Sequence, residues 1–255
     1  SGVATRPIAD LDAYRSQLQQ FVYHSGTFMK PIFAAARKAV SGGGRGRIVF
    51  CEGEDERVLR AVQVVLDEGI ARPILVARPA VLERRLERFG LRMKAGVDFE
   101  VVNPEFDQRY RDYWSTYLEM TERRGVTAQY AKIEMRRRHT LIGAMMIHKG
   151  DADGMICGTF GTHGQHLAYI DQVIGRRPGA GEYAAMNIVM LPGRQLALVD
   201  THVNLDPTAE QLAEITIMAA EQMKHLGISP KIALLSHSNF GSSYSASAVK
   251  MRRAL

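Results

Sequence analysis

The chain alternates short apolar runs with amphipathic stretches, and this alternation limits its possible folds more than any other feature. Residues 48–51 and 73–78 are apolar runs of strand length. Between them, in residues 54–69, apolar side chains recur at helical spacing, acidic residues fill the first turn, and Gly69 closes the stretch. A strand–helix–strand rhythm predicts a parallel sheet covered by helices.

The rhythm continues with a predicted helix at 79–90 and a predicted strand at 98–103. Two helices then interrupt it over residues 105–149, with a break expected near His139. A strand at 155–157 restarts the alternation. This restart predicts a division of the chain into residues 1–45, a first α/β domain at 46–150, and a second α/β domain at 151–255 that is incomplete at its C-terminus.

The second half of the chain adds an antiparallel element. Two apolar runs flank a Pro-Gly turn within residues 187–200, which predicts a β-hairpin. Thr208 and Gln211 are spaced as a capping box at the start of a helix. A further strand is predicted at 231–236. The sequence lacks an initiator Met and stops inside a predicted helix, so we expect the parent protein to continue beyond both ends.

Composition narrows the class of protein. The chain is 46% hydrophobic, and it has no apolar run long enough to cross a bilayer. Its two cysteines, Cys51 and Cys157, form neither a disulfide framework nor a zinc pattern, which favours a reducing, cytoplasmic setting. The net charge of +6 permits an anionic ligand without identifying one. We expect no membrane and no nucleic-acid partner.

Two turns rich in glycine and serine, at 157–164 and 236–243, each follow a predicted strand and precede a predicted helix. Backbone N–H groups and hydroxyls in such turns can hold a phosphate, although a tight turn and a serine-capped loop are the simpler alternatives. If both strands are parallel members of one sheet, the turns share its carboxyl edge. The candidate binding residues are Thr159, Gly161, Thr162, His163, Ser238, Asn239, Gly241 and Ser242.

Other patterns are weaker. His163 and His166 lack the carboxylate or cysteine set of a metal site, so no metal ligand is assigned. Cys157 and His163 lack a third orienting group, which favours Cys157 as a small buried residue and leaves no catalytic residue assigned. The basic run 135–139 has no interleaved aromatic residues, so a solvated helix face is expected there instead of a nucleic-acid site.

From residue 47 onward the chain resembles the phosphotransacetylase (phosphate acetyl/butyryl transferase) family. The segments that carry the resemblance are "FCEGEDERVLRA", "ARPILVARP", "GDADGMICG", "DTHVNLDPTAEQLAEI" and "ALLSHSNFGSS". The resemblance implies a two-domain, three-layer α/β fold similar to isocitrate and isopropylmalate dehydrogenases. It also implies an acyl-CoA cleft that includes the two turns, and a homodimer formed through this domain.

The N-terminal residues resemble a different protein region. "SGVATRPIADLDAYRSQL" is similar to the end of the bacterial malic-enzyme catalytic region, and "FVYHSGTFMKPIFAAARKA" is similar to the connector of hybrid malic enzymes. This implies a hybrid NADP-dependent malic enzyme that converts malate to pyruvate and carbon dioxide with a divalent metal, Mg or Mn. The residues for NADP, metal and malate would precede Ser1.

Three positions depart from the active transferases. Where those enzymes carry two arginines and a lysine, this chain has Thr121, Ala168 and Phe240. The resemblance therefore implies a domain that kept a ligand cleft, lost the transfer chemistry, and serves acetyl-CoA-responsive regulation and oligomerisation. The alternative is a working phosphate acetyltransferase in which other arginines replace the missing cations, namely Arg123, Arg124 or Arg176.

Overall fold

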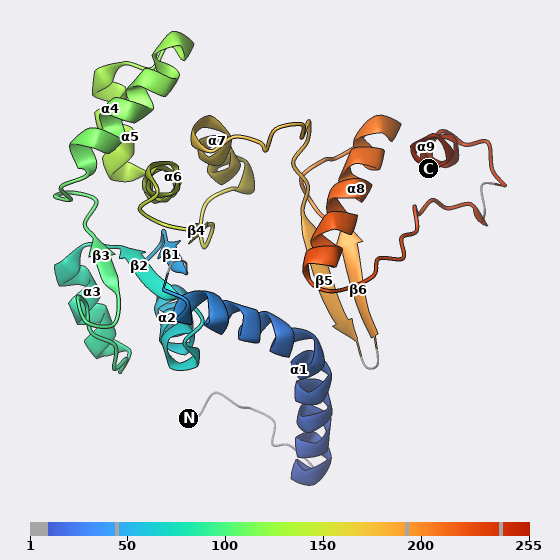
Figure 1. Ribbon diagram of the computed structural model, residues 1–255, viewed down its shortest axis with the longest axis horizontal. Helices are drawn as coiled ribbons and strands as arrows, with labels where there is room; N and C mark the ends of the chain where they lie inside the picture. The colour runs from blue at the N-terminus through green and yellow to red at the C-terminus, as the bar shows by residue number, and fades with distance from the viewer. Residues whose placement is uncertain (1–9, 44–45, 192–193, 240–241) are drawn as a thin grey trace. The chain divides into compact units, whose positions relative to one another are not determined.

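The computed structural model describes residues 10–43, 46–191, 194–239 and 242–255, with the backbone alone for residues 15–27 (Figure 1). The chain forms two compact units, each described here by itself. The first, called the sheet unit, is Phe33–Gly175; the second, called the hairpin unit, contains the residues up to Ile32 together with Arg176–Leu255. None of the helices in these ranges combines the length and apolarity needed to cross a membrane.

The sheet unit is built on four parallel strands in the order β3-β2-β1-β4. The parallel sheet predicted from the alternation is confirmed, and the predicted strands lie within a few residues of the observed ones. Their bounds are β1 Arg47–Phe50, β2 Arg72–Val76, β3 Glu100–Val102 and β4 Gly154–Ile156.

Alternating side chains of the strands enter two separate cores. Val49 of β1 and Ile74 of β2 pack with the helices of residues 110–149, whereas Phe50 and Leu75 pack with those of residues 56–88. Successive side chains of a strand point to opposite faces, so both faces of the sheet are covered. The sheet unit is therefore a three-layer α/β/α arrangement.

Local sequence signals set the ends of the two helices that cover the Phe50 side of the sheet. In α2, Glu56–Glu68, the Asp55 side chain accepts the Arg57 N–H at the start, and Gly69 adopts the left-handed conformation (φ 62°) at the end. Helix α3, Pro79–Arg88, starts with proline, whose missing N–H costs nothing at that position. Both helices were predicted and are confirmed.

The opposite face carries α4, Tyr110–Thr121; the short 3₁₀ turn η1, Glu122–Arg124; α5, Ala128–Arg137; α6, His139–Lys149; and α7, His163–Val173. The break expected near His139 is confirmed, because Arg138 is extended. A helix starting at 105 is wrong. The side chains of Asn103 and Asp107 accept the N–H groups of Glu105 and Arg109 and hold that segment in turns.

The structure divides the chain at a different place from the boundary predicted after residue 150. β4 hydrogen-bonds to β1, and α7 packs against α6, so residues 151–175 belong to the sheet unit. At the other end, the last part of α1, Leu11–Ser41, belongs to the sheet unit from Phe33 onward, and not to a separate connector ending at 45. Strand pairing decides the first boundary, and long-range hydrogen bonds between the end of α1 and the sheet unit accompany the second, so neither is visible in local sequence.

The hairpin unit contains the antiparallel pair β5, Met186–Leu191, and β6, Arg194–Val199, as predicted from the Pro-Gly turn. Helix α8, Ala209–His225, starts with the predicted capping box. Helix α9 is Ala246–Ala254.

The strand predicted at 231–236 is wrong. The segment is irregular, and Ile232 and Leu235 are 51% and 76% exposed. A strand needs a neighbour to satisfy its backbone groups, and within the described ranges no strand pairs with this segment. The hairpin unit as described therefore has no parallel sheet.

Candidate functional site

The strand order creates a topological switch point between β1 and β4. After β1 the chain passes through α2 to β2 on one side, and after β3 it passes through α4, α5 and α6 to β4 on the other side. The loops after β1 and β4 therefore diverge at the carboxyl edge of the sheet, which is where open α/β sheets place their ligands. The candidate site is built from these two loops.

Close packing shapes the loop after β1. Cys51 is completely buried, and Glu52 is 4% exposed. A Cβ on Gly53 would lie 2.9 Å from the backbone oxygen of Val76, so only glycine lets this loop run so close to the end of β2. The same crowding fixes Glu52 at the start of the loop.

The Glu52 carboxylate holds the loop after β4. It accepts the N–H of Gly158 at 3.0 Å and the Thr159 hydroxyl at 3.5 Å. Gly158 has a φ of 100°, which favours glycine. In the described part of the chain no Lys or Arg makes an ion pair with this buried carboxylate, so its charge rests on hydrogen bonds. The carboxylate thereby ties together two loops 106 residues apart in sequence.

Arg57 supports the same loop from the first turn of α2. Its Nη2 donates to the Thr159 carbonyl at 3.2 Å, and the guanidinium also pairs with Asp55. The side chain stays 71% exposed, so an anionic ligand near Thr159 would find a cation already beside it.

The two cysteines meet at the same edge. The Cys51 N–H donates to the Ile156 carbonyl at 3.0 Å, which continues the β1–β4 pairing and sets Cys51 beside Cys157. A hydrogen bond from the Cys51 thiol lowers the pKa of Cys157 to about 7 against the opposing effect of burial, with smaller contributions from His166 and Thr140. The same bond, together with burial, raises the pKa of Cys51.

His166 is the histidine that faces this cysteine pair. Its Nε2 donates to the Phe160 carbonyl at 2.9 Å, and its Nδ1 lies 2.7 Å from Thr140 Oγ1. Thr140 thus connects this ring with Cys157, whose pKa both side chains help to lower. The histidine that the sequence raised as a partner of Cys157 was His163, which instead starts α7 at an exposed position.

Four of the predicted binding residues lie together in the loop after β4 and at the start of α7. They are Thr159, Gly161, Thr162 and His163. Gly161, with φ 98°, leaves no room for a side chain, because a Cβ would lie 2.9 Å from His166 Nε2. The expectation that Cys157 is a buried apolar residue is wrong, since it is half-buried and hydrogen-bonded.

The second predicted turn belongs to the hairpin unit. Ser238 and Ser242 lie in their own turn, in which the Ser238 N–H bonds to Ser236 Oγ at 3.3 Å and the Ser242 N–H to the Asn239 carbonyl at 3.0 Å. Gly241 and Phe240 lie outside the described residues. The premise that both turns end strands of one sheet is wrong, and the ligand assignment stays a prediction.

Comparison with known proteins decides the family. Residues 27–255 match the family described as "Phosphate acetyl/butaryl transferase". The chain belongs to this family. It is 52% identical, over its whole length, to an NADP-dependent malic enzyme of Salmonella typhimurium, and 49% identical to an NAD-dependent malic enzyme of Rhizobium meliloti. In both cases the chain spans 33% of the relative's length.

The fold agrees with this assignment. A phosphotransacetylase structure from Streptococcus pyogenes superposes with a TM-score of 0.75 at 30% identity, covering 89% of this chain and 68% of the other. The family resemblance read from the sequence is thus confirmed, including a phosphotransacetylase-type segment within malic enzymes.

Two of the three positions at which the resemblance implies that a cation is missing lie within the described residues. Thr121 is buried in the helical layer, and its hydroxyl donates to the Tyr117 carbonyl at 2.6 Å. Ala168 lies on an exposed part of α7. Of the arginines considered as substitutes, Arg123 and Arg124 lie in η1, and Arg176 lies over the Tyr183 ring in the hairpin unit.

The sequence indicated no role for Glu52, Arg57 or Thr140, and it raised His166 only as a weak metal ligand. The available signal was the dense charge of "EGEDER" directly after a buried strand, which was explained as a helix start alone. Thr140 gave no signal, because only the packing of α6 against α7 brings it to His166.

Proposed function

We propose that this chain is the acetyl-CoA-responsive regulatory and oligomerisation domain of a malic enzyme that oxidises malate to pyruvate and carbon dioxide, and that it does not itself transfer acetyl groups. The single observation that carries the proposal is that Glu52 holds the loop after β4 in place, while positions 121 and 168, where the family resemblance implies arginines, are Thr and Ala. A transferring phosphate develops charge that such cations stabilise, and ligand binding alone does not need them.

Several features support ligand binding at that loop. Glu52 and Arg57 hold Thr159 in place, and Thr162 makes no capping bond with its own hydroxyl. A hydroxyl left free by its helix is available to a ligand phosphate. An effector regulates only if it binds two states of the enzyme unequally, so we expect acetyl-CoA to bind more tightly to one conformation of the whole enzyme.

The deciding experiment measures malate-dependent reduction of NADP by the full-length parent enzyme, with and without acetyl-CoA. Removing the domain should abolish the acetyl-CoA response. In the intact enzyme, Thr162→Ala should weaken the response about fivefold, the effect of one lost hydrogen bond. Ser115→Ala is the matched control and should change nothing. A response that survives deletion of the domain would refute the regulatory role.

The alternative function, an active phosphate acetyltransferase, is favoured by the shared family and fold. It predicts acetyl phosphate formation from acetyl-CoA and phosphate by the complete domain. We expect only background formation. Robust turnover would replace the regulatory proposal by the catalytic one.

The remaining features of the proposal concern the whole enzyme. We propose NADP and Mg or Mn as cofactors of the malic-enzyme region, a homodimer formed through this domain, a cytoplasmic location, and a fold related to isocitrate and isopropylmalate dehydrogenases. We propose that this domain does not determine the choice of nicotinamide cofactor, since one relative at 49% identity is an NAD-dependent malic enzyme. Light scattering of the purified chain would test the dimer.

A further inference from the structure

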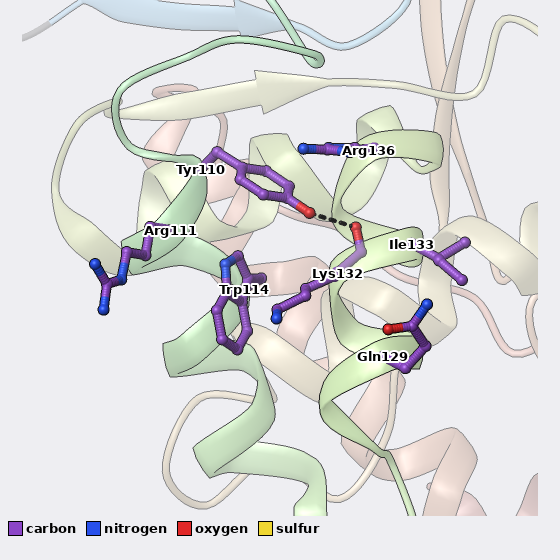
Figure 2. Close-up of a pocket in the computed structure, with 7 residues that line it drawn as sticks. All are labelled: Tyr110, Arg111, Trp114, Gln129, Lys132, Ile133 and Arg136. Atoms are coloured by element: carbon purple, nitrogen blue, oxygen red, sulfur yellow. Dashed lines mark hydrogen bonds between the residues drawn. The ribbon is translucent and has the colours of Figure 1, made fainter.

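A concave site lies between α4 and α5, and none of its lining residues belongs to the loops described above. The cavity has a volume of about 460 Å³, within the range of small-molecule sites. One turn of α4 and two turns of α5 supply its lining (Figure 2), which consists of Tyr110, Arg111, Trp114, Gln129, Lys132, Ile133 and Arg136.

The charge of this lining is entirely positive. Arg111, Lys132 and Arg136 line the cavity, and no acidic residue does. Within the described ranges, none of the three cations forms an ion pair with a carboxylate, whereas Lys149 and Arg138 on the neighbouring α6 and α5–α6 junction do. Three cations around one hollow leave a local excess of positive charge that an anionic ligand would neutralise.

Aromatic rings hold two of these cations in position. The Lys132 ammonium lies 4.5 Å from the centre of the Trp114 ring, and the Arg136 guanidinium lies 4.6 Å from the centre of the Tyr110 ring. These cation–π contacts hold the two charges beside the cavity, while both side chains stay exposed. The site is therefore arranged before a ligand arrives, which lowers the cost of binding.

The floor of the cavity is fixed as well. The Tyr110 hydroxyl donates to the Lys132 carbonyl at 2.8 Å and joins the two helices, as Figure 2 shows. Tyr110 and Trp114 are half-buried and pack against the core. A flat basic helix face would have neither this hollow nor its aromatic floor.

We propose that this cavity binds a nucleotide: a small organic phosphate with a planar base. The forked guanidinium groups of Arg111 and Arg136 match phosphate oxygens, and Lys132 adds a point charge. Arg136 stacks on Tyr110 with one face, which leaves its exposed second face for a planar base. Ile133, 41% exposed, adds an apolar contact. The proposal is independent of the acetyl-CoA role.

Tryptophan fluorescence can report ligand binding in this cavity. Trp114 is the single tryptophan of the chain and lies in the cavity under Lys132. ADP titrated into the 255-residue chain should change the Trp114 fluorescence saturably, and inorganic phosphate should act more weakly because it lacks the base. The paired substitution Lys132→Gln/Arg136→Gln should weaken ADP binding by at least about tenfold, since two charge-assisted contacts are lost.

The matched control is Arg84→Gln/Arg137→Gln, which removes the same charge from exposed positions outside the cavity. Calorimetry on each variant gives affinities that do not depend on the indole, and far-ultraviolet circular dichroism checks folding. The proposal would be overturned if both double variants lost ADP affinity equally, or if ADP showed no saturable binding to the unsubstituted chain. Phosphate binding as tightly as ADP would also overturn it.

Two further titrations separate the proposal from its competitors. Loss of acetyl-CoA binding in Lys132→Gln/Arg136→Gln would make the cavity the acetyl-CoA site and overturn a separate ligand. A single-stranded oligonucleotide that binds more tightly than ADP would overturn it in favour of nucleic acid. The expected result is that neither occurs.

Discussion

Gly143 sits in α6 where the helix presses against the carboxyl end of β1, and it offers a sharp test of how tightly this edge is packed. A Cβ at this position would lie 2.6 Å from Cys51 Sγ, and 3.4 Å from Met155 Cε and Val49 Cγ1. Ordinary contacts between such atoms start near 3.5 Å, so the new methyl overlaps the sulfur by about 1 Å. Cys51 is completely buried, and its backbone is bonded to Ile156.

The magnitude follows from two opposing effects. Overpacking of a dense core costs about 1–3 kcal/mol, whereas replacing glycine by alanine inside a helix returns about 1 kcal/mol. We therefore expect Gly143→Ala to lower the free energy of unfolding of the sheet unit by about 1 kcal/mol. Gly164→Ala in α7 is the matched control. A Cβ there meets nothing within 4 Å, so that variant should gain up to about 1 kcal/mol.

Urea unfolding followed by Trp114 fluorescence measures the sheet unit specifically, because Trp114 belongs to that unit. Combining Gly143→Ala with Cys51→Ala completes a double-mutant cycle. Removing the sulfur should relieve the clash and make the double variant more stable than the sum of the single effects. The reasoning fails if Gly143→Ala stabilises the chain as Gly164→Ala does, or if the cycle shows no coupling.

Three further predictions concern the loops and their charges. Glu52→Ala should increase hydrogen exchange of the Gly158 amide at least about tenfold, because its acceptor is lost, while the exposed Glu56→Ala leaves that amide unchanged. Alkylation of Cys157 should rise with a midpoint near pH 7, and a midpoint at the ordinary thiol value would contradict the Cys51 hydrogen bond. Burial opposes ionisation of Asp200, yet backbone N–H groups lower its pKa to about 2. Its contribution is therefore present above about pH 4 and lost as pH falls toward 2, and Asp200→Asn should flatten that part of the acid-unfolding curve.

Local signals in the sequence were sufficient where one residue determines a helix end. Asp55 and Gly69 bound α2, and Thr208 with Gln211 starts α8, because capping involves only neighbours in sequence. The break at Arg138 was likewise visible. These features need no knowledge of the rest of the molecule.

Long-range pairing set the limits of prediction. Residues 231–236 have the composition of a strand, but a strand forms only beside another. The candidate site shows the same limit, since Glu52 meets Gly158 across 106 residues. Choosing His166 over His163 required the direction in which α7 leaves the loop, since the two lie one helical turn apart.

The end of α1 matters for anyone who dissects this protein. Arg37 Nε donates to the Glu68 carbonyl at 2.8 Å at the end of α2, and Arg72 at the start of β2 donates to the Val40 carbonyl at 3.0 Å. A recombinant fragment cut at the glycine-rich segment before β1 would keep all four strands but strip both contacts from its surface. Fragments intended for binding assays should therefore begin upstream of Phe33, so that the part of α1 that contacts the sheet unit is retained.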